Sequence, residues 1–517
     1  MYSCTALFGV VSLFSSFVAG VVEGSTPLAV FPESFEWGLA TAPAQTEDLL
    51  DDTWLAFAEE GNVAAWNNTG RPEARVNFWT NPEVDIGLSA KAGSSVFRMG
   101  VDWGRLCPQH PEKAMNKGVQ NRTALARYHE IIRLVRASGQ RVMLTLFHHA
   151  IPKWSQPDGG WTNSSTVGYF EAFVADVVEE LGEDVSYWTT FNEPTVFAMM
   201  VYCSGIWPPG PELPAYQSLA CMFDTGIPYT GTYWSAMQNI QAAHRHIYGI
   251  IKKGKGNGTV GVAHNVAVHL PDNIWDKPAN AAINSMMNFP FIDAIATHLD
   301  FIGLNYYGKE ITAGDSVAIL PNQEYSESGR AIYPDGIVEL LRSFHYRFNN
   351  CTSWNKGDCP RGERLPRSKY LPFFITENGI ADRTDILRPA YIVEHLLGLS
   401  VVMKEQIPVL GYIHWTISDN WEWADGYCPM FGLASVDRST QELKRTLRLY
   451  SYNLLKTTVK TRTILLKTRT DAWERVRHAI ETGETRPFCR ALDGKTSLND
   501  PIQRKFADQD WRLTFTT

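Results

Sequence analysis

Two glutamates stand in similar local settings although they lie far apart in the chain. Glu193 belongs to the sequence FNEP and Glu377 to ITENG, each follows an apolar, β-favouring run, and each has a neighbouring asparagine, Asn192 or Asn378. Two carboxylates that face each other across a pocket suit glycosidic bond cleavage, because one can protonate the leaving oxygen while the other attacks the anomeric carbon. For either glutamate alone, a solvated loop carboxylate is the simpler interpretation.

Eight short apolar or β-branched runs recur along the chain, with longer amphipathic stretches between several of them. The runs cover residues 35–42, 94–101, 140–147, 187–194, 258–265, 300–307, 372–379 and 408–416. In segments 124–139 and 166–182 the apolar residues repeat at intervals of three and four, which is typical of helices. This alternation predicts an α/β fold with a parallel sheet, most economically a single (β/α)8 TIM barrel.

The barrel would bring the two glutamates together. Glu193 closes the fourth run and Glu377 lies in the seventh. The C-terminal ends of all barrel strands meet at one mouth, where the active site of such a fold lies. The sequence therefore predicts that both carboxylates face the same pocket.

Three regions are expected along the chain. Residues 25–460 would form the barrel, residues 1–24 an apolar signal peptide or membrane anchor, and residues 461–517 a C-terminal extension. Both alternatives for the first region suit its first 22 residues, which carry no charged side chain. The segment 456–478 is basic, and it suits either contact with an anionic membrane surface or a solvated helix.

The composition indicates a large folded protein without a nucleic-acid partner. Its 517 residues are 44% hydrophobic and 20% charged, so the chain can bury a sizeable core. A net charge of −8, without a long Lys/Arg block, excludes a nucleic-acid footprint. The eight cysteines show no zinc-ligand spacing, so neither a metal nor a cofactor is expected. Cys351 and Cys359 could close a disulfide, although free thiols are the simpler interpretation.

Three segments together resemble glycoside hydrolase family 1, the retaining β-glycosidases. They are TFNEP, FITENG and WTISDNWEWADGY, and the similarity runs from about Phe35 to about Tyr452. The resemblance implies that Glu193 is the acid/base and Glu377 the nucleophile. It also implies binding roles for further residues: Gln45, His148, Asn192, Glu422 and Trp423 as hydrogen-bonding groups for the sugar, Trp415 as the platform beneath it, Arg98 as the cation beside the nucleophile, and Tyr307 as the hydroxyl partner of the nucleophile.

Elementary electrostatics supports the two catalytic roles. An arginine near Glu377 would keep that carboxylate ionised and nucleophilic. A less polar setting around Glu193 would keep that carboxyl protonated until it is needed. Taken alone, Arg98 would suit an ordinary buried ion pair and His148 a satisfied core histidine.

Other segments resemble one branch of the family, the galactolipid galactosyltransferases of the chloroplast outer envelope. They include ATAPAQTEDLLDDTWLAFAEE, TLFHHAIPKW, EYSESGRAIYPDG and ETRPFCRALDG. The chain departs from usual family members at residues 148–152, where it has HHAIP in place of HWDLP. The branch implies a galactolipid substrate at a membrane surface, and a double displacement in which a second galactolipid replaces water as the acceptor.

Two other functions remain open at this point. A soluble β-glycosidase that hydrolyses small β-glucosides or β-galactosides would use the same residues, and it would fit a secretory or extracellular location. A non-catalytic glycan-binding relative is the third alternative, but binding alone does not need both Glu193 and Glu377. The segment 199–223 could contact lipid, or it could simply be a packed loop at the edge of the barrel.

Overall fold

The computed structural model describes most of the chain. The described residues are 26–489 and 502–505, except 116–117, 211–220, 222, 225–226, 229–230, 257, 314–315, 318–319, 321–322 and 350–365. The expected leader 1–24 and the possible Cys351–Cys359 disulfide lie outside this described part. Each helix within it is too short or too polar to span a bilayer.

Eight parallel strands close into a barrel. Around the barrel their order is β2-β3-β4-β5-β8-β9-β11-β12, and β12 pairs with β2 to complete the ring. The strands are β2 (Glu36–Ala40), β3 (Val96–Gly100), β4 (Arg141–Phe147), β5 (Tyr187–Asn192), β8 (Thr259–Pro271), β9 (Phe301–Ala313), β11 (Phe373–Asn378) and β12 (Val409–His414). Six of the predicted runs contain a whole strand and the other two contain the first parts of β8 and β9, so the predicted TIM barrel is confirmed.

The strands are buried on both faces, which explains their continuous apolar sequences. Every residue of β3 and β11 is buried, as expected where helices cover the outside and side chains fill the inside. Alternate positions separate into two hydrophobic clusters: Val96 and Phe374 belong to one, whereas Phe97 and Phe373 belong to the other. The alternation follows from the two-residue period of a strand.

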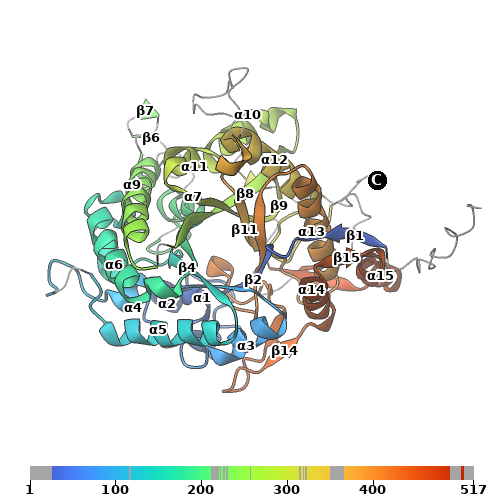
Figure 1. The fold of residues 1–517 in the computed structure, drawn as a ribbon, viewed down its shortest axis with the longest axis horizontal. Helices are drawn as coiled ribbons and strands as arrows, with labels where there is room; N and C mark the ends of the chain where they lie inside the picture. Colours follow the sequence, from blue (N-terminus) through green and yellow to red (C-terminus); the bar gives the residue numbers. More distant parts are fainter. Residues whose placement is uncertain are drawn as a thin grey trace, which may run out of the picture.

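Helices surround the strands (Figure 1). The α-helices are α1 (Pro43–Thr46), α2 (Thr53–Glu59), α3 (Glu83–Lys91), α4 (Trp103–Leu106), α5 (Arg122–Ala137), α6 (Ser165–Leu181), α7 (Pro194–Met199), α9 (Thr232–Lys253), α10 (Lys277–Met287), α11 (Pro290–Ile295), α12 (Asp335–Asn349), α13 (Arg388–Lys404), α14 (Leu449–Thr461) and α15 (Leu466–Thr482). The predicted helical segments match α5 and α6 to within two residues. Asn121 caps α5 by accepting a hydrogen bond from the Ala124 N–H.

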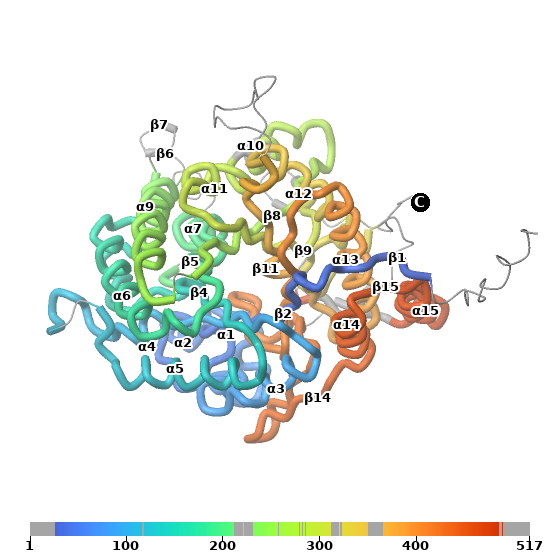
Figure 2. The backbone as a smooth tube through the Cα atoms, viewed as in Figure 1, coloured from blue at the N-terminus to red at the C-terminus, as the bar shows by residue number. Residues whose placement is uncertain are grey.

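Short antiparallel strand pairs accompany the barrel. They are β1 (Pro27–Val30) with β15 (Thr463–Leu465), β6 (Phe223–Asp224) with β7 (Ile227–Pro228), β10 (Ser316–Val317) with β9, β13 (Ala434–Val436) with β14 (Arg445–Leu447), and β16 (Thr485–Phe488) with β17 (Ile502–Lys505). In Figure 2 the blue β1 runs beside the red β15. The beginning and the end of the described barrel are therefore held together.

The first part of the C-terminal extension packs on the barrel wall. Buried Glu394 of α13 accepts hydrogen bonds from two side chains of α15, Arg469 Nε at 2.7 Å and Trp473 Nε1 at 2.6 Å. One side of the basic segment 456–478 therefore faces the protein.

The described part of the chain contains two disulfides that were not predicted from the sequence. Cys203 bonds to Cys221, and Cys428 bonds to Cys489. Neither pair has a local sequence signal, because the partners are 18 and 61 residues apart. Within the described part Cys107 is a buried free thiol.

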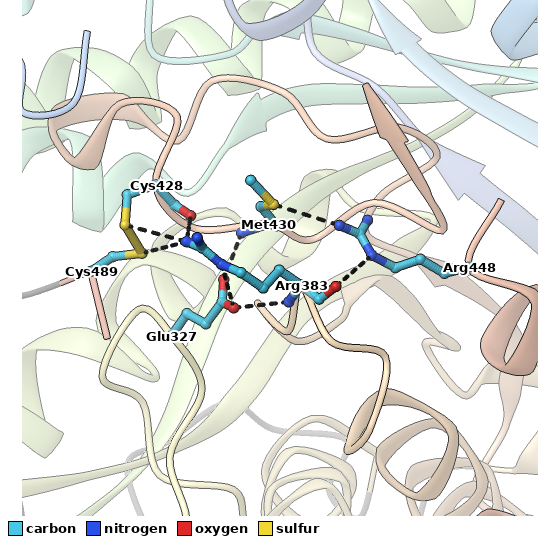
Figure 3. Close-up of a disulfide and its surroundings, with 6 residues drawn as sticks. All are labelled: Glu327, Arg383, Cys428, Met430, Arg448 and Cys489. Carbon is cyan, nitrogen blue, oxygen red and sulfur yellow. Dashed lines mark hydrogen bonds and ion pairs between the residues drawn. A yellow bond between two sulfur atoms is a disulfide. The ribbon is translucent and has the colours of Figure 1, made fainter. Parts of the chain in front are cut away.

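The Cys428–Cys489 bond fastens the end of β16 beside the WTISDNWEWADGY segment, which ends at residue 427. Figure 3 shows Arg383 between this bond and Glu327. Arg383 Nε donates to Glu327 Oε1 at 3.0 Å, and its Nη2 donates to the Cys428 carbonyl at 2.8 Å. The Cys489 N–H donates to the Glu327 carbonyl at 2.8 Å. Covalent and polar contacts together thus hold this C-terminal segment.

Candidate active site

The predicted site residues converge at the C-terminal ends of the barrel strands. A pocket of about 350 Å³ lies there, and its walls contain Gln45, His148, Asn192, Glu193, Tyr307, Glu377, Trp415, Glu422 and Trp423. The remaining predicted residue, Arg98 of β3, is fully buried and contacts Glu377. The structure therefore brings all ten predicted residues into one site.

Arg98 and Tyr307 hold the Glu377 carboxylate from two sides. Arg98 Nη1 donates to Glu377 Oε1 at 2.5 Å, and the Tyr307 hydroxyl donates to Oε2 at 2.6 Å. Arg98 Nη1 also donates to the Thr376 carbonyl at 3.0 Å. Charge-assisted hydrogen bonds of this kind fix a carboxylate in one orientation. The Glu377 carboxylate is thus held in a defined position on a buried strand.

The Glu193 carboxylate is held by amides. Asn305 Nδ2 donates to Glu193 Oε1 at 2.9 Å, and Asn265 Nδ2 donates to the same oxygen at 3.1 Å. The other oxygen, Oε2, lies 3.7 Å from His149 Nε2. Glu193 has a left-handed backbone, with φ 42° and ψ 54°, at the turn from β5 into α7. That turn aims the side chain into the pocket.

A chain of hydrogen bonds links the two carboxylates. Asn192 Oδ1 accepts from Arg98 Nη2 at 2.6 Å and from Asn305 Nδ2 at 3.2 Å. Arg98 also contacts Glu377, and Asn305 also contacts Glu193. The protonation state of one carboxyl can therefore affect the other through these partners as well as through space.

The pKa of Glu377 is raised to about 7. Burial raises it most, Arg98 lowers it, the charge of Glu193 raises it, and the hydrogen bond from Tyr307 lowers it. Without Arg98 the burial effect would be unopposed by a neighbouring cation. The arginine therefore acts in the direction expected from the sequence, although burial outweighs it.

The surroundings of Glu193 are polar, so the expected less polar setting is wrong. Burial raises the pKa of Glu193, but a hydrogen bond and positive charge from His149, the Arg330 charge and the Asn305 amide lower it to about 2. The largest of these lowering effects requires a protonated His149. Burial lowers the pKa of that imidazole from its ordinary value. Near neutral pH the ring is neutral, and Arg330 and the amides alone favour the Glu193 carboxylate.

Part of the pocket wall combines aromatic rings with polar atoms that have no hydrogen-bond partner among the described residues. The His148 and Trp415 ring centroids are 6.1 Å apart, with an interplanar angle of 30°. Gln45 Nε2 donates to the Trp421 carbonyl at 2.6 Å, whereas Gln45 Oε1 and His148 Nδ1 are buried without a hydrogen-bond partner among the described residues. Such atoms need partners, and sugar hydroxyls can supply them.

Several pocket residues were not predicted from the sequence. They are His149, Val196, Met200, Ile206, Trp207, Arg330, Ala424 and Asp425. All but Val196 lie in segments that the sequence analysis quoted: residues 199–223, WTISDNWEWADGY, the HHAIP departure with His149, and EYSESGR, which ends at Arg330. The Arg330 guanidinium lies 4.9 Å from the centroid of the Tyr307 ring, so it brings a cation into the pocket that contains both glutamates.

Glu422 gives a testable pH dependence of stability. Its pKa is raised to about 8, mainly by burial; Arg330 lowers it, and the charges of Asp425, Glu193 and Glu377 raise it further. An unfolded glutamate titrates near pH 4.3, so the folded state holds the extra proton between about pH 4 and 8. Glu422 therefore makes its full contribution to the free energy of unfolding below about pH 4, and this contribution is lost as the pH rises toward 8.

We expect Glu422→Gln to flatten the pH dependence of the free energy of unfolding between pH 5 and 8. The flattening should stay below about 1.4 kcal/mol per pH unit, the limit for one proton. Urea unfolding at several pH values measures it. Glu405→Gln is the matched control, because the pKa of exposed Glu405 is lowered by Arg342. Parallel curves for wild type and Glu422→Gln would contradict the assignment.

Comparison with known proteins gives the family. The family model "Glycosyl hydrolase family 1" matches residues 28–295 and 290–463. The chain is 39% identical to "Galactolipid galactosyltransferase SFR2, chloroplastic" of Arabidopsis thaliana, over 93% of this chain and 82% of that protein. It is 38% identical to "Beta-glucosidase-like SFR2, chloroplastic" of Oryza sativa subsp. japonica, over 95% of this chain and 87% of that protein.

Solved structures agree with this result. The β-glycosidase from Pyrococcus horikoshii superposes with a TM-score of 0.68 and 26% sequence identity, over 86% of this chain and 98% of that chain. The family match spans the complete barrel, including both glutamates of the pocket. This chain is an enzyme with glycosyl-transfer activity, and it belongs to glycosyl hydrolase family 1.

Proposed function

We propose that this enzyme transfers β-galactose from a monogalactosyl diacylglycerol to a second galactolipid, with retention of configuration. The observation that carries the proposal is the pairing of Glu377, held by Arg98 and Tyr307, with Glu193 in one pocket. The printed name of the Arabidopsis thaliana relative supports a galactolipid substrate. The products would be oligogalactolipids and diacylglycerol.

The first step is a displacement at the anomeric carbon. A Glu377 oxygen forms a bond to that carbon while the bond to the glycerol oxygen breaks, and Glu193 gives its proton to the departing oxygen. Diacylglycerol leaves and a covalent galactosyl-enzyme remains. Arg98 and Tyr307 orient Glu377 for this attack, since their hydrogen bonds hold both carboxylate oxygens.

The second step reverses the roles. Glu193, now a carboxylate, takes the proton from a hydroxyl of the acceptor galactolipid, whose oxygen attacks the anomeric carbon and releases Glu377. Two inversions give overall retention. The amides of Asn265 and Asn305 remain on one Glu193 oxygen and keep the carboxyl in place for both steps.

The outer pocket wall suits a lipid. Val196, Met200, Ile206, Trp207 and Ala424 provide apolar surface next to the catalytic pair. Ile206 is 37% exposed whereas Trp207 is 6% exposed, so the segment both packs on the barrel and presents an apolar edge. This supports lipid contact by the described start of segment 199–223. Residues 211–220 lie outside the described part.

The location proposed for the enzyme is the chloroplast outer envelope. Both plant relatives are named chloroplastic. Galactolipid transfer requires access to a membrane surface, and the envelope is the site implied by the branch that the sequence resembles. A secretory or extracellular location is the alternative if small glycosides are the substrate.

Hydrolysis is the second candidate function, favoured by the likeness to the Pyrococcus horikoshii β-glycosidase. Purified enzyme in mixed micelles of monogalactosyl diacylglycerol distinguishes the functions. We expect di- and trigalactosyl lipids together with diacylglycerol, all absent with Glu377→Gln. Free galactose as the main sugar product would establish a hydrolase, and absence of turnover would favour a glycan-binding role.

A further inference from the structure

We propose that His149 is a positioning residue that favours the protonated, acidic form of Glu193 through an acceptor nitrogen facing that carboxyl. The inference rests on the proposed role of Glu193 as the acid/base. His149 stands where usual family members have tryptophan, within HHAIP. An imidazole can accept a hydrogen bond, whereas an indole N–H can only donate.

The His149 ring is held in one orientation. Its exposed fraction is 3%, and its ring lies parallel to Phe197 at a centroid distance of 6.2 Å. Trp207 and Trp423 contact it edge-on at 4.7 and 5.0 Å. Its backbone is also fixed, because the His149 carbonyl accepts a hydrogen bond from Trp54 Nε1 at 2.9 Å. The direction of Nε2 is therefore defined by packing.

Asn192 identifies His149 Nε2 as an acceptor. Arg98 Nη2 lies 2.6 Å from Asn192 Oδ1. A guanidinium can only donate, so the oxygen of the Asn192 amide must face Arg98. The Asn192 NH₂ group therefore faces His149, with Nδ2 3.2 Å from Nε2. The nitrogen that receives this N–H carries a lone pair, and the imidazole proton is on Nδ1.

The same Nε2 faces Glu193. It lies 3.7 Å from Oε2, whereas Oε1 accepts hydrogen bonds from Asn305 and Asn265. The single lone pair of Nε2 already accepts the Asn192 N–H, so a protonated Oε2 can approach it as a second, weaker donor, whereas an ionised Oε2 would face it with no proton between the two atoms. Since Oε1 is occupied by two N–H donors, the carboxyl proton belongs on Oε2.

The acid proton remains available to the substrate. At 3.7 Å the contact is longer than an ordinary O–H···N hydrogen bond, so the proton can turn toward a leaving oxygen in the pocket. Burial and the charge of Arg98 lower the pKa of His149, whereas Glu193 raises it, and the net shift is downward. The ring therefore favours the acid form without removing its proton.

Two substrates with different leaving groups test the inference. Monogalactosyl diacylglycerol releases an alcohol that needs a proton, whereas dinitrophenyl β-galactoside releases an acidic phenol that does not. We expect His149→Phe to lower kcat/KM for the lipid by about 100-fold, the low end of general-acid effects, and to change kcat/KM for the phenyl substrate less than threefold. His149→Gln, whose amide oxygen can accept a hydrogen bond, should recover part of the loss.

Two further variants distinguish a wrong proposed function from a wrong role for His149. Glu193→Gln should lower kcat/KM for the lipid relative to the phenyl substrate even more strongly. Glu377→Gln should be inactive on both substrates. If Glu377→Gln retains activity, the proposed function is wrong. If Glu377→Gln is inactive but His149→Phe lowers kcat/KM equally for both substrates, only the role proposed for His149 is wrong. Turnover of the phenyl substrate shows that His149→Phe is folded; if that variant does not fold, His149→Leu is measured with the same criterion.

Discussion

Replacing Glu377 with glutamine is expected to lower kcat for galactosyl transfer by roughly 10,000-fold or more, the scale on which loss of a catalytic nucleophile acts. The amide keeps the size of the side chain, and its oxygen can still accept from Arg98 while its NH₂ group faces the Tyr307 oxygen as a donor; these two residues hold both carboxylate oxygens of Glu377 now. It cannot form the covalent galactosyl-enzyme. Initial rates with monogalactosyl diacylglycerol measure the effect.

Glu405→Gln is the matched control for this variant. It makes the same chemical change on the surface, where Glu405 pairs with Arg342, and it should leave the rate unchanged. A Glu377→Gly variant supplied with azide adds a second check, because a small anion attacking from the vacated side should give a galactosyl azide of inverted configuration. Transfer at the wild-type rate by Glu377→Gln would show that Glu377 is not the nucleophile.

Arg98→Met is expected to lower both activity and stability. Arg98 is fully buried, and its removal leaves the Glu377 carboxylate without a neighbouring cation. Breaking a buried pair in this way costs about 3–5 kcal/mol. The variant should also raise the pKa of Glu377 above its present value of about 7. Glu377 would then be protonated at neutral pH, and the remaining activity should shift toward alkaline pH.

Urea unfolding and a pH–rate profile together measure these effects. Arg342→Met is the control, since the exposed pair of Arg342 with Glu405 should contribute less than about 1 kcal/mol. A neutral-pH optimum retained in Arg98→Met would show that the guanidinium does not set the ionisation of Glu377. Equal losses of stability in the two arginine variants would contradict the buried-pair argument.

The barrel could be predicted because its strands are buried on both faces. Each apolar run in the sequence marks a strand such as β3 or β11. The two longest strands were predicted too short: β8 continues to Pro271 and β9 to Ala313. Their later parts pair with each other, as at His269 with Glu310. In β8 the apolar residues continue as Val266, Ala267 and Val268, so that extension had a signal in the sequence, whereas Lys309 and Glu310 interrupt the apolar pattern of β9.

Those site residues that lie in sequence motifs could be predicted. Glu193, Glu377 and the sugar-binding segment lie in motifs, and the structure places them in one pocket. His149 and Arg330 join the pocket through the conformation of two connecting segments, and the disulfide partners of Cys203 and Cys428 depend on the folding of distant segments. The polar surroundings of Glu193 escaped prediction for the same reason, because Asn265 and Asn305 come from neighbouring strands.

The left-handed backbone of Glu193 sets stability against activity at one position. This conformation costs a side chain other than glycine roughly 1–2 kcal/mol, and glycine adopts it freely. Under the proposed mechanism, no residue that relieves the backbone also supplies the carboxylate. Selection for thermal stability alone would therefore favour discarding this glutamate. Under the same mechanism, a glycine that relieved the φ of 42° would stabilise the fold and abolish transfer.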